Sequence, residues 1–309
     1  DLARLCRILG LHDKAIRTLQ AALAARPLHW PCRQALTQLH LDRGELSAAA
    51  SLAKKVPRKA SPEACFFAGS VTVRSAIDRQ DDQDVEAGLA LLARAAAAGY
   101  DSPDLHMYFA QAHEFAGRPQ EAVVAYQRCL ELAPEDDVTV REVATLGLAR
   151  TALRQNSIAL ALSCLRLAHD QFPGSAELHA LMAQSHLSLG QHNDAIALAE
   201  EAAHLDPLAL EPLRILWQAG VQASDWPLAT STLQHLLDLE PNNPETWLAL
   251  AQTRLATADH EGVRSALARA LLIDRRNPVT LQRAASLLLQ MDLAASAKRL
   301  LQQALAQRR

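Results

Sequence analysis

Small and apolar residues recur in this chain with a period of 34 residues. Pro173, Pro207 and Pro241 stand one period apart, and each closes an apolar run. With this proline counted as position 32 of a unit, positions 4, 7, 8 and 11 are mostly small or apolar, and so are positions 20, 24 and 27. Both sets follow the period of one helical face, so each unit is predicted to be a pair of amphipathic helices. In the unit that starts at position 176 these residues are His179, Met182, Ala183, His186, Ala195, Ala199 and Ala202.

Glycines mark the turn between the two helices of a unit. Gly44, Gly117 and Gly190 all fall at position 15, where the first helix must stop and the chain must reverse. Small residues at positions 8 and 20 allow the two helix backbones to approach closely. A single helix pair cannot bury both of its apolar stripes, so neighbouring units must stack to complete a continuous core.

The repeat resembles that of the tetratricopeptide repeat (TPR) family. Residues 176–207, AELHALMAQSHLSLGQHNDAIALAEEAAHLDP, are close to the family's pattern, and the resemblance covers essentially the whole chain. It implies an all-α fold, an α-solenoid with a right-handed superhelix of about nine helix-turn-helix repeats. Thr145 and His179 depart from the pattern at position 4, and Arg254 departs from it at position 11. HEAT and armadillo repeats would need longer periods.

We assign residues 1–309 to a single solenoid whose first repeat is truncated. Asp1 already falls at position 6 of a unit, and Arg309 lands at position 32 with no capping helix after it. We therefore expect the chain to be a segment of a larger protein. The approximate repeats are 1–29, 30–61, 62–102, 103–141, 142–175, 176–209, 210–243, 244–277 and 278–309.

Two of these units are longer than the period. The unit at 62–102 has extra residues around 75–87, and the unit at 103–141 has extra residues at 135–142. One interpretation is that the helices there are longer. The other is a bend in the solenoid or a protruding loop that binds a partner.

The chain lacks the usual signatures of catalysis. It contains no G-x-G-x-x-G, G-x-x-x-x-G-K-[ST], G-x-S-x-G or H-E-x-x-H motif, so we expect no enzyme activity, cofactor or metal in this segment. His106 and His113, like His179 and His186, recur seven residues apart and resemble metal-ligand pairs. They occupy positions 4 and 11, however, where a ring packs between helices, and we favour packing. The cysteines are interpreted as small apolar residues.

The resemblance implies that positions 2, 5, 6, 9, 12 and 13 of the first helices line a concave groove, where TPR proteins hold peptides or helices of other proteins. Position 9 is often glutamine, whose amide can bond the backbone of an extended peptide. Arginines at groove positions, Arg74 among them, suit carboxylate or phosphate groups. The groove residues selected on this basis are Gln111, Arg150, Arg154, Gln184, Arg214, Gln218 and Gln252.

These residues also have structural explanations. Glutamine is a common residue of helix surfaces, and the arginines can pair with acidic neighbours such as Glu177 and Glu211. Acidic side chains at position 2 are favourable near a helix N-terminus. That position holds Glu63, Asp104, Glu177, Glu211 and Glu245. The Lys and Asn residues of the chaperone-type carboxylate clamp are missing from the groove positions, which disfavours that function.

The net charge of −3 is unevenly distributed. Basic residues prevail in 1–61 and 262–309 and acidic ones in 62–261, a pattern that favours an acidic partner or self-association. Only 4% of the residues are aromatic and no basic stripe spans the repeats, so nucleic acid is not an expected partner. No run of 18 apolar residues occurs, which excludes a membrane span. Five scattered cysteines fit a reducing compartment such as the cytoplasm, and the excess of Arg over Lys fits a bacterial source.

The sequence thus predicts a protein-interaction scaffold that binds a peptide or helix of a partner protein in its groove. The alternative is a regulatory or substrate-recruiting region of a multidomain enzyme, such as a protease, glycosyltransferase or signalling ATPase. A third possibility, RNA binding, would require an affinity that falls steeply with salt.

Overall fold

Polar residues precede most of the helices in the part of the chain that the structure, a computed structural model, describes: residues 12–27 and 29–307. The Ser61 hydroxyl accepts a hydrogen bond from the backbone N–H of Ala64 at 3.3 Å, and Ser102 caps the next first helix in the same way. Proline occupies the first turn of both of these helices, where its missing N–H costs nothing. Local sequence therefore fixes where these helices begin.

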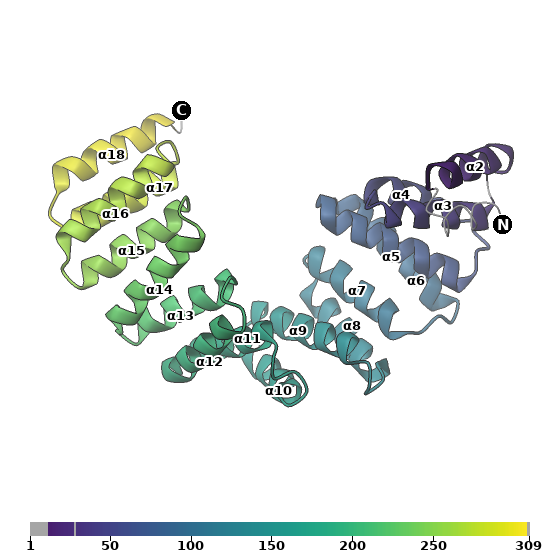
Figure 1. Cartoon of the computed structure of the whole chain (residues 1–309), viewed down its shortest axis with the longest axis horizontal. Coiled ribbons are helices and arrows are strands. Elements are labelled where there is room, and N and C mark those ends of the chain that lie inside the picture. Colours follow the sequence, from purple (N-terminus) through teal and green to yellow (C-terminus); the bar gives the residue numbers. More distant parts are fainter. Residues whose placement is uncertain (1–11, 28, 308–309) are drawn as a thin grey trace. The chain divides into compact units, whose positions relative to one another are not determined.

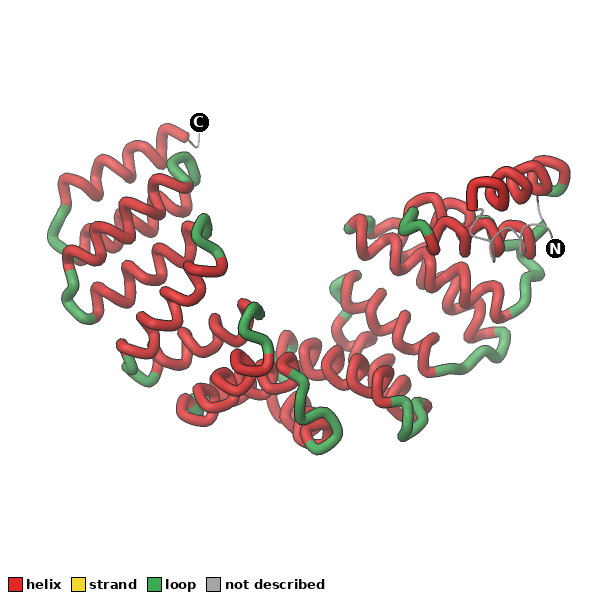
Figure 2. Tube along the Cα trace, in the orientation of Figure 1, coloured by secondary structure: helices red, strands yellow, loops and turns green. Residues whose placement is uncertain are grey.

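The chain forms two compact units, Asp1–Leu160 and Ala161–Arg309, with the boundary inside helix α10. Figure 1 labels the helices, and Figure 2 shows the turns that join them. The helices of the first unit are α2 (His12–Ala25), α3 (Trp30–Asp42), α4 (Leu46–Ala53), α5 (Pro62–Arg79), α6 (Asp82–Ala97), α7 (Pro103–Phe115), α8 (Pro119–Leu132) and α9 (Val138–Arg154). Helix α10 spans Ile158–His169.

The second unit continues the same alternation of helices and short turns. Its helices are α11 (Ala176–Ser188), α12 (His192–Leu205), α13 (Leu210–Gln222), α14 (Trp226–Leu239), α15 (Pro244–Ala256), α16 (His260–Ile273), α17 (Pro278–Gln290) and α18 (Ala294–Gln307). Within the described residues no strand occurs, so the expected all-α fold is confirmed.

Helices that are consecutive in sequence pack in pairs. In the first unit α3 packs on α4, α5 on α6 and α7 on α8; in the second, α11 packs on α12, α13 on α14, α15 on α16 and α17 on α18. The second helix of a pair also packs on the first helix of the next, as α8 does on α9 and α12 on α13. The apolar stripes are buried in these contacts. Ala110, Ala122, Ala183 and Ala195, at positions 8 and 20, have no exposed surface.

The first helices of neighbouring pairs also touch one another. Helix α7 lies between α5 and α9 in the first unit, while α11 contacts α13 and α15 contacts α17 in the second. First helices therefore lie side by side on one face of each unit. This surface carries the positions at which the sequence placed the groove.

A left-handed residue ends the first helix at position 15 in seven of the described repeats, and at Gln80, which is position 19, in the longer unit at 62–102. Gly44, Gly117 and Gly190 have φ of +74°, +67° and +73° as expected. The same conformation is adopted without glycine by Asn156, Ser224, Ala258 and Asp292. The geometry of the turn is therefore dictated by the packing of the helix pair, and glycine only makes it easier to adopt.

The extra residues of the two long units lengthen helices. Helices α5 and α6 have 18 and 16 residues, against 13 and 14 in α7 and α8, and only Gln80 and Asp81 lie between α5 and α6. In the next unit α9 starts at Val138 and has 17 residues. The interpretation as longer helices is confirmed, and the idea of a protruding loop at 75–87 is wrong because those residues continue the helical stripes.

Candidate functional site

The first-helix surface of the first unit contains a hollow of about 450 Å³, which we call the Arg74 pocket. Helix α5 contributes Arg74 and Ile77, one turn apart on the same face. The hollow thus combines apolar side chains with charged ones. Its other lining residues are Gln111, Glu114 and Phe115 from α7 and Arg154 from α9.

Glu114 is the centre of an ionic network beside this pocket. Its carboxylate lies 2.7 Å from Arg154 Nη2 and 3.5 Å from Arg150 Nε, and it accepts a hydrogen bond of 3.0 Å from the Tyr126 hydroxyl. Only 14% of the Glu114 side chain is exposed. A largely buried carboxylate with one hydrogen bond and two ion pairs keeps both arginines close to it.

Tyr126 reaches Glu114 because a glycine leaves room for its ring. Tyr126 belongs to the second helix α8, and its ring passes close to Gly147 on α9. A Cβ atom built at Gly147 would lie 2.4 Å from the ring, so any other residue there would displace the tyrosine. Burial, together with the negative charge of Glu114, raises the pKa of the Tyr126 hydroxyl well above its usual value. The hydroxyl is therefore a permanent donor to Glu114 at neutral pH.

Positive charge exceeds negative charge around the Arg74 pocket. Two guanidinium groups and one carboxylate line it, and that carboxylate is already shared with Arg150. Arg74 is exposed and makes no ion pair with any residue that the structure describes. The pocket therefore suits an anionic group beside an apolar one.

The second unit contains a hollow of about 350 Å³, which we call the Trp217 pocket. Apolar side chains from three helices form its base: Trp217 from α13, Leu233 and Leu236 from α14, and Ala249 from α15. The two leucines are almost fully buried and belong to the core of this unit. Polar and charged residues form its rim: Arg214, Gln218, Asn243, Glu245, Thr246 and Arg283.

The charges at the rim of the Trp217 pocket are mutually paired. Arg214 lies 3.4 Å from Glu240 and 3.9 Å from Glu211, and Arg283 pairs with Glu245. The amide of Asn243 donates to Glu240 at 2.9 Å. The charges of Arg214 and Arg283 are therefore compensated by carboxylates of the protein, whereas Arg74 in the first unit has no such partner among the described residues.

The seven predicted groove residues divide into three groups. Gln111 and Arg154 line the Arg74 pocket, and Arg150 belongs to its ionic network. Arg214 and Gln218 line the Trp217 pocket. The remaining two, Gln184 on α11 and Gln252 on α15, are exposed on first helices and line neither pocket.

One of the glutamines at position 9 already has a hydrogen-bond partner within the protein. Gln38, which shares position 9 with the other glutamines, donates its amide to Asp42 of the same helix at 2.9 Å. This contact matches the alternative explanation, an ordinary residue of a helix surface. The arginines also follow their alternative explanation in part, because Arg214 contacts Glu211 as the sequence suggested.

Sequence reasoning missed the residues that organise the two pockets. Glu114 stands at position 12, a groove position, but a lone acidic residue gave no reason to select it. Tyr126 stands at position 24 and was interpreted as core only. Trp217 offered a signal that was available: it is large at position 8, where the other complete repeats have Thr, Gly or Ala.

The acidic residues at position 2 lie in the first turns of their helices, as expected. Glu63, Asp104, Glu177, Glu211 and Glu245 begin α5, α7, α11, α13 and α15, respectively. A negative charge there interacts favourably with the helix dipole. Two of the five also pair with arginines at the Trp217 pocket, so their role is not confined to capping.

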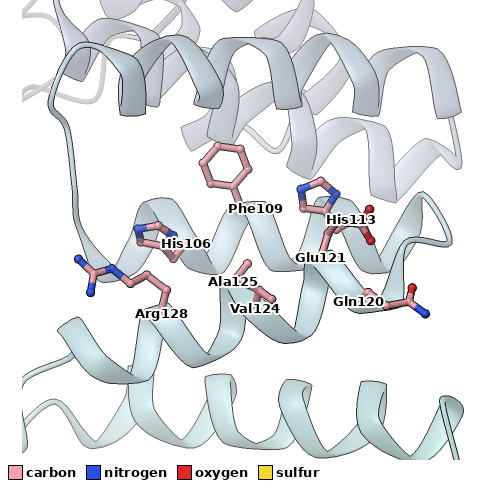
Figure 3. A pocket seen from close by; sticks show the side chains of 8 residues that line it. All are labelled: His106, Phe109, His113, Gln120, Glu121, Val124, Ala125 and Arg128. Carbon is pink, nitrogen blue, oxygen red and sulfur yellow. The ribbon is translucent and has the colours of Figure 1, made fainter.

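The paired histidines pack against neighbouring side chains. His179 is fully buried, and Figure 3 shows Phe109 between His106 and His113 on α7, above Val124 and Ala125 of α8. The His106 ring makes a hydrogen bond of 2.6 Å to the Asp101 carboxylate. The rings of Phe109 and His113 are stacked, with their centroids 6.1 Å apart. Burial lowers the pKa of His113, which keeps its ring neutral at pH 7.

Neither metal nor thiol chemistry emerges from the described part of the chain. No three His, Cys, Asp or Glu side chains there gather as a metal site would require. Cys32, Cys65, Cys129 and Cys164 are free thiols, and burial raises the pKa of Cys129 and Cys164 to about 11 each, which makes them poor nucleophiles. Cys6 lies outside the described residues.

Helix pairs stacked through small residues, with a free surface of first helices, define an α-helical repeat protein. Two family models, both described as tetratricopeptide repeat, match residues 73–137 and 115–185. Residues 73–185 therefore contain tetratricopeptide repeats, and such repeats are scaffolds for protein interaction. No curated protein sequence matches the chain.

Solved structures share the fold at low sequence identity. A chain of the APC/C hetero-tetramer Cut9-Hcn1 has a TM-score of 0.56 and 15% identity, and the match covers 96% of this chain and 56% of that one. Pseudomonas aeruginosa PilF has a TM-score of 0.53 and 17% identity, and the match covers 64% of this chain and 88% of PilF. MamA from Desulfovibrio magneticus RS-1 has a TM-score of 0.51 and 14% identity, and the match covers 57% of this chain and 97% of the MamA chain. Among the described residues, no helix combines the length and apolar character that crossing a bilayer requires.

Proposed function

We propose that the first-helix surface of the first unit binds an acidic segment of a partner protein, as a peptide or a helix, at the Arg74 pocket. The observation that carries this proposal is the excess of guanidinium groups around a hollow that also exposes apolar side chains. An Asp or Glu of the partner would pair with Arg74 and Arg154. An adjacent apolar side chain would contact Ile77 and Phe115.

The fixed position of Arg154 supports this assignment. Ordering a long arginine side chain on binding costs up to about 2 kcal/mol of conformational entropy. Because Glu114 already holds Arg154, and Tyr126 holds Glu114, much of that cost is met before a partner arrives. Glu114 and Tyr126 are thus positioning residues, and Arg74 and Arg154 are the binding ones.

The other predicted groove residues supply contacts that do not depend on partner sequence. Gln111 lies in the same pocket, while Gln184, Gln218 and Gln252 present amides on the first helices of the second unit. A primary amide both donates and accepts, so each can bond the backbone of an extended segment. Arg150 and Arg214 add charge beside them.

The test is a selection of short random peptides displayed on phage, carried out on the wild-type chain and on Arg74→Glu. Wild type is expected to retain peptides rich in Asp and Glu, and Arg74→Glu is expected to bind them at least about 10-fold more weakly, since one charge reversal removes an attraction and adds a repulsion. The affinity of these peptides should also fall as salt is raised from about 0.05 to 0.5 M.

The matched control is Lys59→Glu, which makes the same change in charge at an exposed residue between α4 and α5, outside the pocket. It should bind the selected peptides as wild type does. Equal weakening by both variants would mean that only overall charge matters, and peptides without acidic residues would contradict the proposal directly.

A further inference from the structure

Trp217 breaks the rule that position 8 is small. In a TPR-like helix pair this position faces the second helix, where close approach leaves little space. For example, a Cβ added at Gly69 would lie 2.8 Å from Leu92. An indole cannot take that place, and Trp217 instead lines a hollow between α13, α14 and α15. The other complete repeats have at position 8 Thr37, Gly69, Ala110, Ala149, Ala183, Ala251 and Ala285.

Packing alone does not explain an indole at this position. The Nε1 atom of Trp217 is buried and has no hydrogen-bond partner among the described residues, whereas that of Trp247 donates to the carbonyl of Pro241 at 3.0 Å. A buried donor without a partner costs about 1–3 kcal/mol, a cost that phenylalanine or leucine would avoid. Trp217 is therefore less favourable for stability than phenylalanine or leucine would be, and its side chain forms one wall of an apolar hollow.

The charges around the hollow select an uncharged occupant. Arg214 and Arg283 are compensated by Glu240, Glu211 and Glu245, so neither a carboxylate nor an ammonium group would find an unmatched charge. The volume of about 350 Å³ lies at the lower end of the range for small ligand sites, about 300–1,000 Å³, which suits one large side chain.

The rim provides a polar contact for the backbone that would carry such a side chain. Gln218 is exposed at the edge of the hollow, and its amide makes no hydrogen bond within residues 12–27 and 29–307. An amide beside an apolar hollow is the arrangement by which a peptide is held through its backbone while one side chain is buried.

We propose that the Trp217 pocket is an anchor site for one large uncharged apolar side chain, such as leucine, methionine or phenylalanine, in a peptide segment of a partner protein. This inference rests on the proposed function in one respect, that first-helix surfaces bind partner segments. It does not depend on the Arg74 pocket, which recognises a different chemical group.

The test removes the acidic site first, so that the two proposals fail separately. Short random peptides displayed on phage are selected on the Arg74→Glu variant in about 0.5 M NaCl, where charge pairing at exposed sites is largely screened. The expected result is a set of peptides that share one large apolar residue. Replacing that residue by alanine should weaken each peptide at least about 10-fold.

Trp217→Ala in the same Arg74→Glu background should lose these peptides to a similar degree, because alanine gives position 8 the size found in the other repeats. Trp226→Ala is the matched control, since Trp226 is also half-buried in the α13–α14 pair but does not line the pocket. Circular dichroism establishes that each variant is folded. If Trp217→Ala proves unfolded, Gln218→Trp is used instead, because it changes an exposed rim residue and covers the entrance.

Three results would overturn the inference. One is that no peptide is retained by Arg74→Glu at high salt. Another is that the retained peptides share no apolar residue. The last is that they bind to folded Trp217→Ala, or to Gln218→Trp, as well as to the Trp226→Ala control. Loss of acidic peptides by Arg74→Glu at low salt, with any of these three results, would leave the proposed function standing without this second site.

Discussion

The repeats at 103–141 and 210–243 carry a large ring at different core positions of the helix pair. The first has Ala110 at position 8 and Tyr126 at position 24, while the second has Trp217 at position 8 and Leu233 at position 24. In the first, the Tyr126 hydroxyl passes Gly147 and holds Glu114 on the first-helix surface. In the second, the indole forms the side of an apolar hollow whose rim charges are paired.

The difference shows how one scaffold produces two kinds of surface. The tyrosine on the second helix donates its hydroxyl to Glu114 on the first helix, and Glu114 in turn pairs with two arginines. The tryptophan on the first helix instead forms one side of the Trp217 pocket. The backbone pattern is unchanged in both cases, so the kind of surface that forms depends on which of the two core positions carries the ring.

Placing a ring at position 8 of the first of these repeats should have the largest effect on stability. Ala110 has no exposed surface, so Ala110→Trp overpacks the α7–α8 contact and should destabilise the chain by about 3 kcal/mol. The measurement is the urea midpoint followed by circular dichroism. The neighbouring Gln111→Trp, which is only half-buried, should change the midpoint little. An unchanged midpoint for Ala110→Trp would mean that position 8 does not control the spacing of the helices.

Removing the charge of Glu114 should have the next largest effect. Glu114→Gln keeps the shape of the side chain but weakens its bonds to Tyr126, Arg150 and Arg154, and we expect a loss of about 2 kcal/mol. Glu121→Gln, an exposed carboxylate in the first turn of α8, is the control and should lose only about 0.3–1 kcal/mol, the contribution of a charge near a helix N-terminus. Equal stability of the two variants would show that the network contributes nothing to the fold.

Alkaline pH should destabilise the first unit through Tyr126. Burial and the Glu114 charge raise the folded-state pKa of Tyr126, while an unfolded tyrosine titrates near about 10. The stabilisation is complete below pH 10 and is lost as pH rises from there towards the folded-state pKa, with a slope of at most about 1.4 kcal/mol per pH unit.

The measurement is the urea midpoint between about pH 8 and pH 11, compared with Tyr126→Phe, which should show a smaller slope. Some slope will remain, because burial also raises the pKa of Tyr108, Cys129 and Cys164. Identical slopes for wild type and Tyr126→Phe would contradict the role given to the Tyr126 hydroxyl.

The smallest effect concerns the turns of the same two repeats. Position 15 is Gly117 in one and Ser224 in the other, with φ of +67° and +60°. Gly117→Ala should destabilise by about 1 kcal/mol and Ser224→Gly should stabilise by about 0.5–1 kcal/mol, because only glycine adopts this conformation without strain. A Cβ at Gly117 would meet nothing within 4 Å, so the backbone alone is tested. Thermal unfolding midpoints should move in opposite directions, and shifts of the same sign would refute this account.

The sequence by itself determined the repeat. The helix pairs, their small contact positions and the turn at position 15 are set by residues within about one period, because helices and turns depend on local spacing. The same locality explains why the long units could be interpreted as longer helices. The residues that the family resemblance assigned to a groove, among them Gln111, Arg154, Arg214 and Gln218, lie on first helices, because that placement depends only on their position within a repeat.

Tertiary structure alone decided what those positions do. Glu114, Tyr126 and Arg154 come from three different helices, and no spacing in the sequence indicates that they meet. The ion pair between Arg283 and Glu245 likewise joins two repeats, and no spacing in the sequence indicates it. The physical reason is that a side chain's charge and exposure depend on the neighbours that stacking brings to it, and stacking places residues from different repeats side by side.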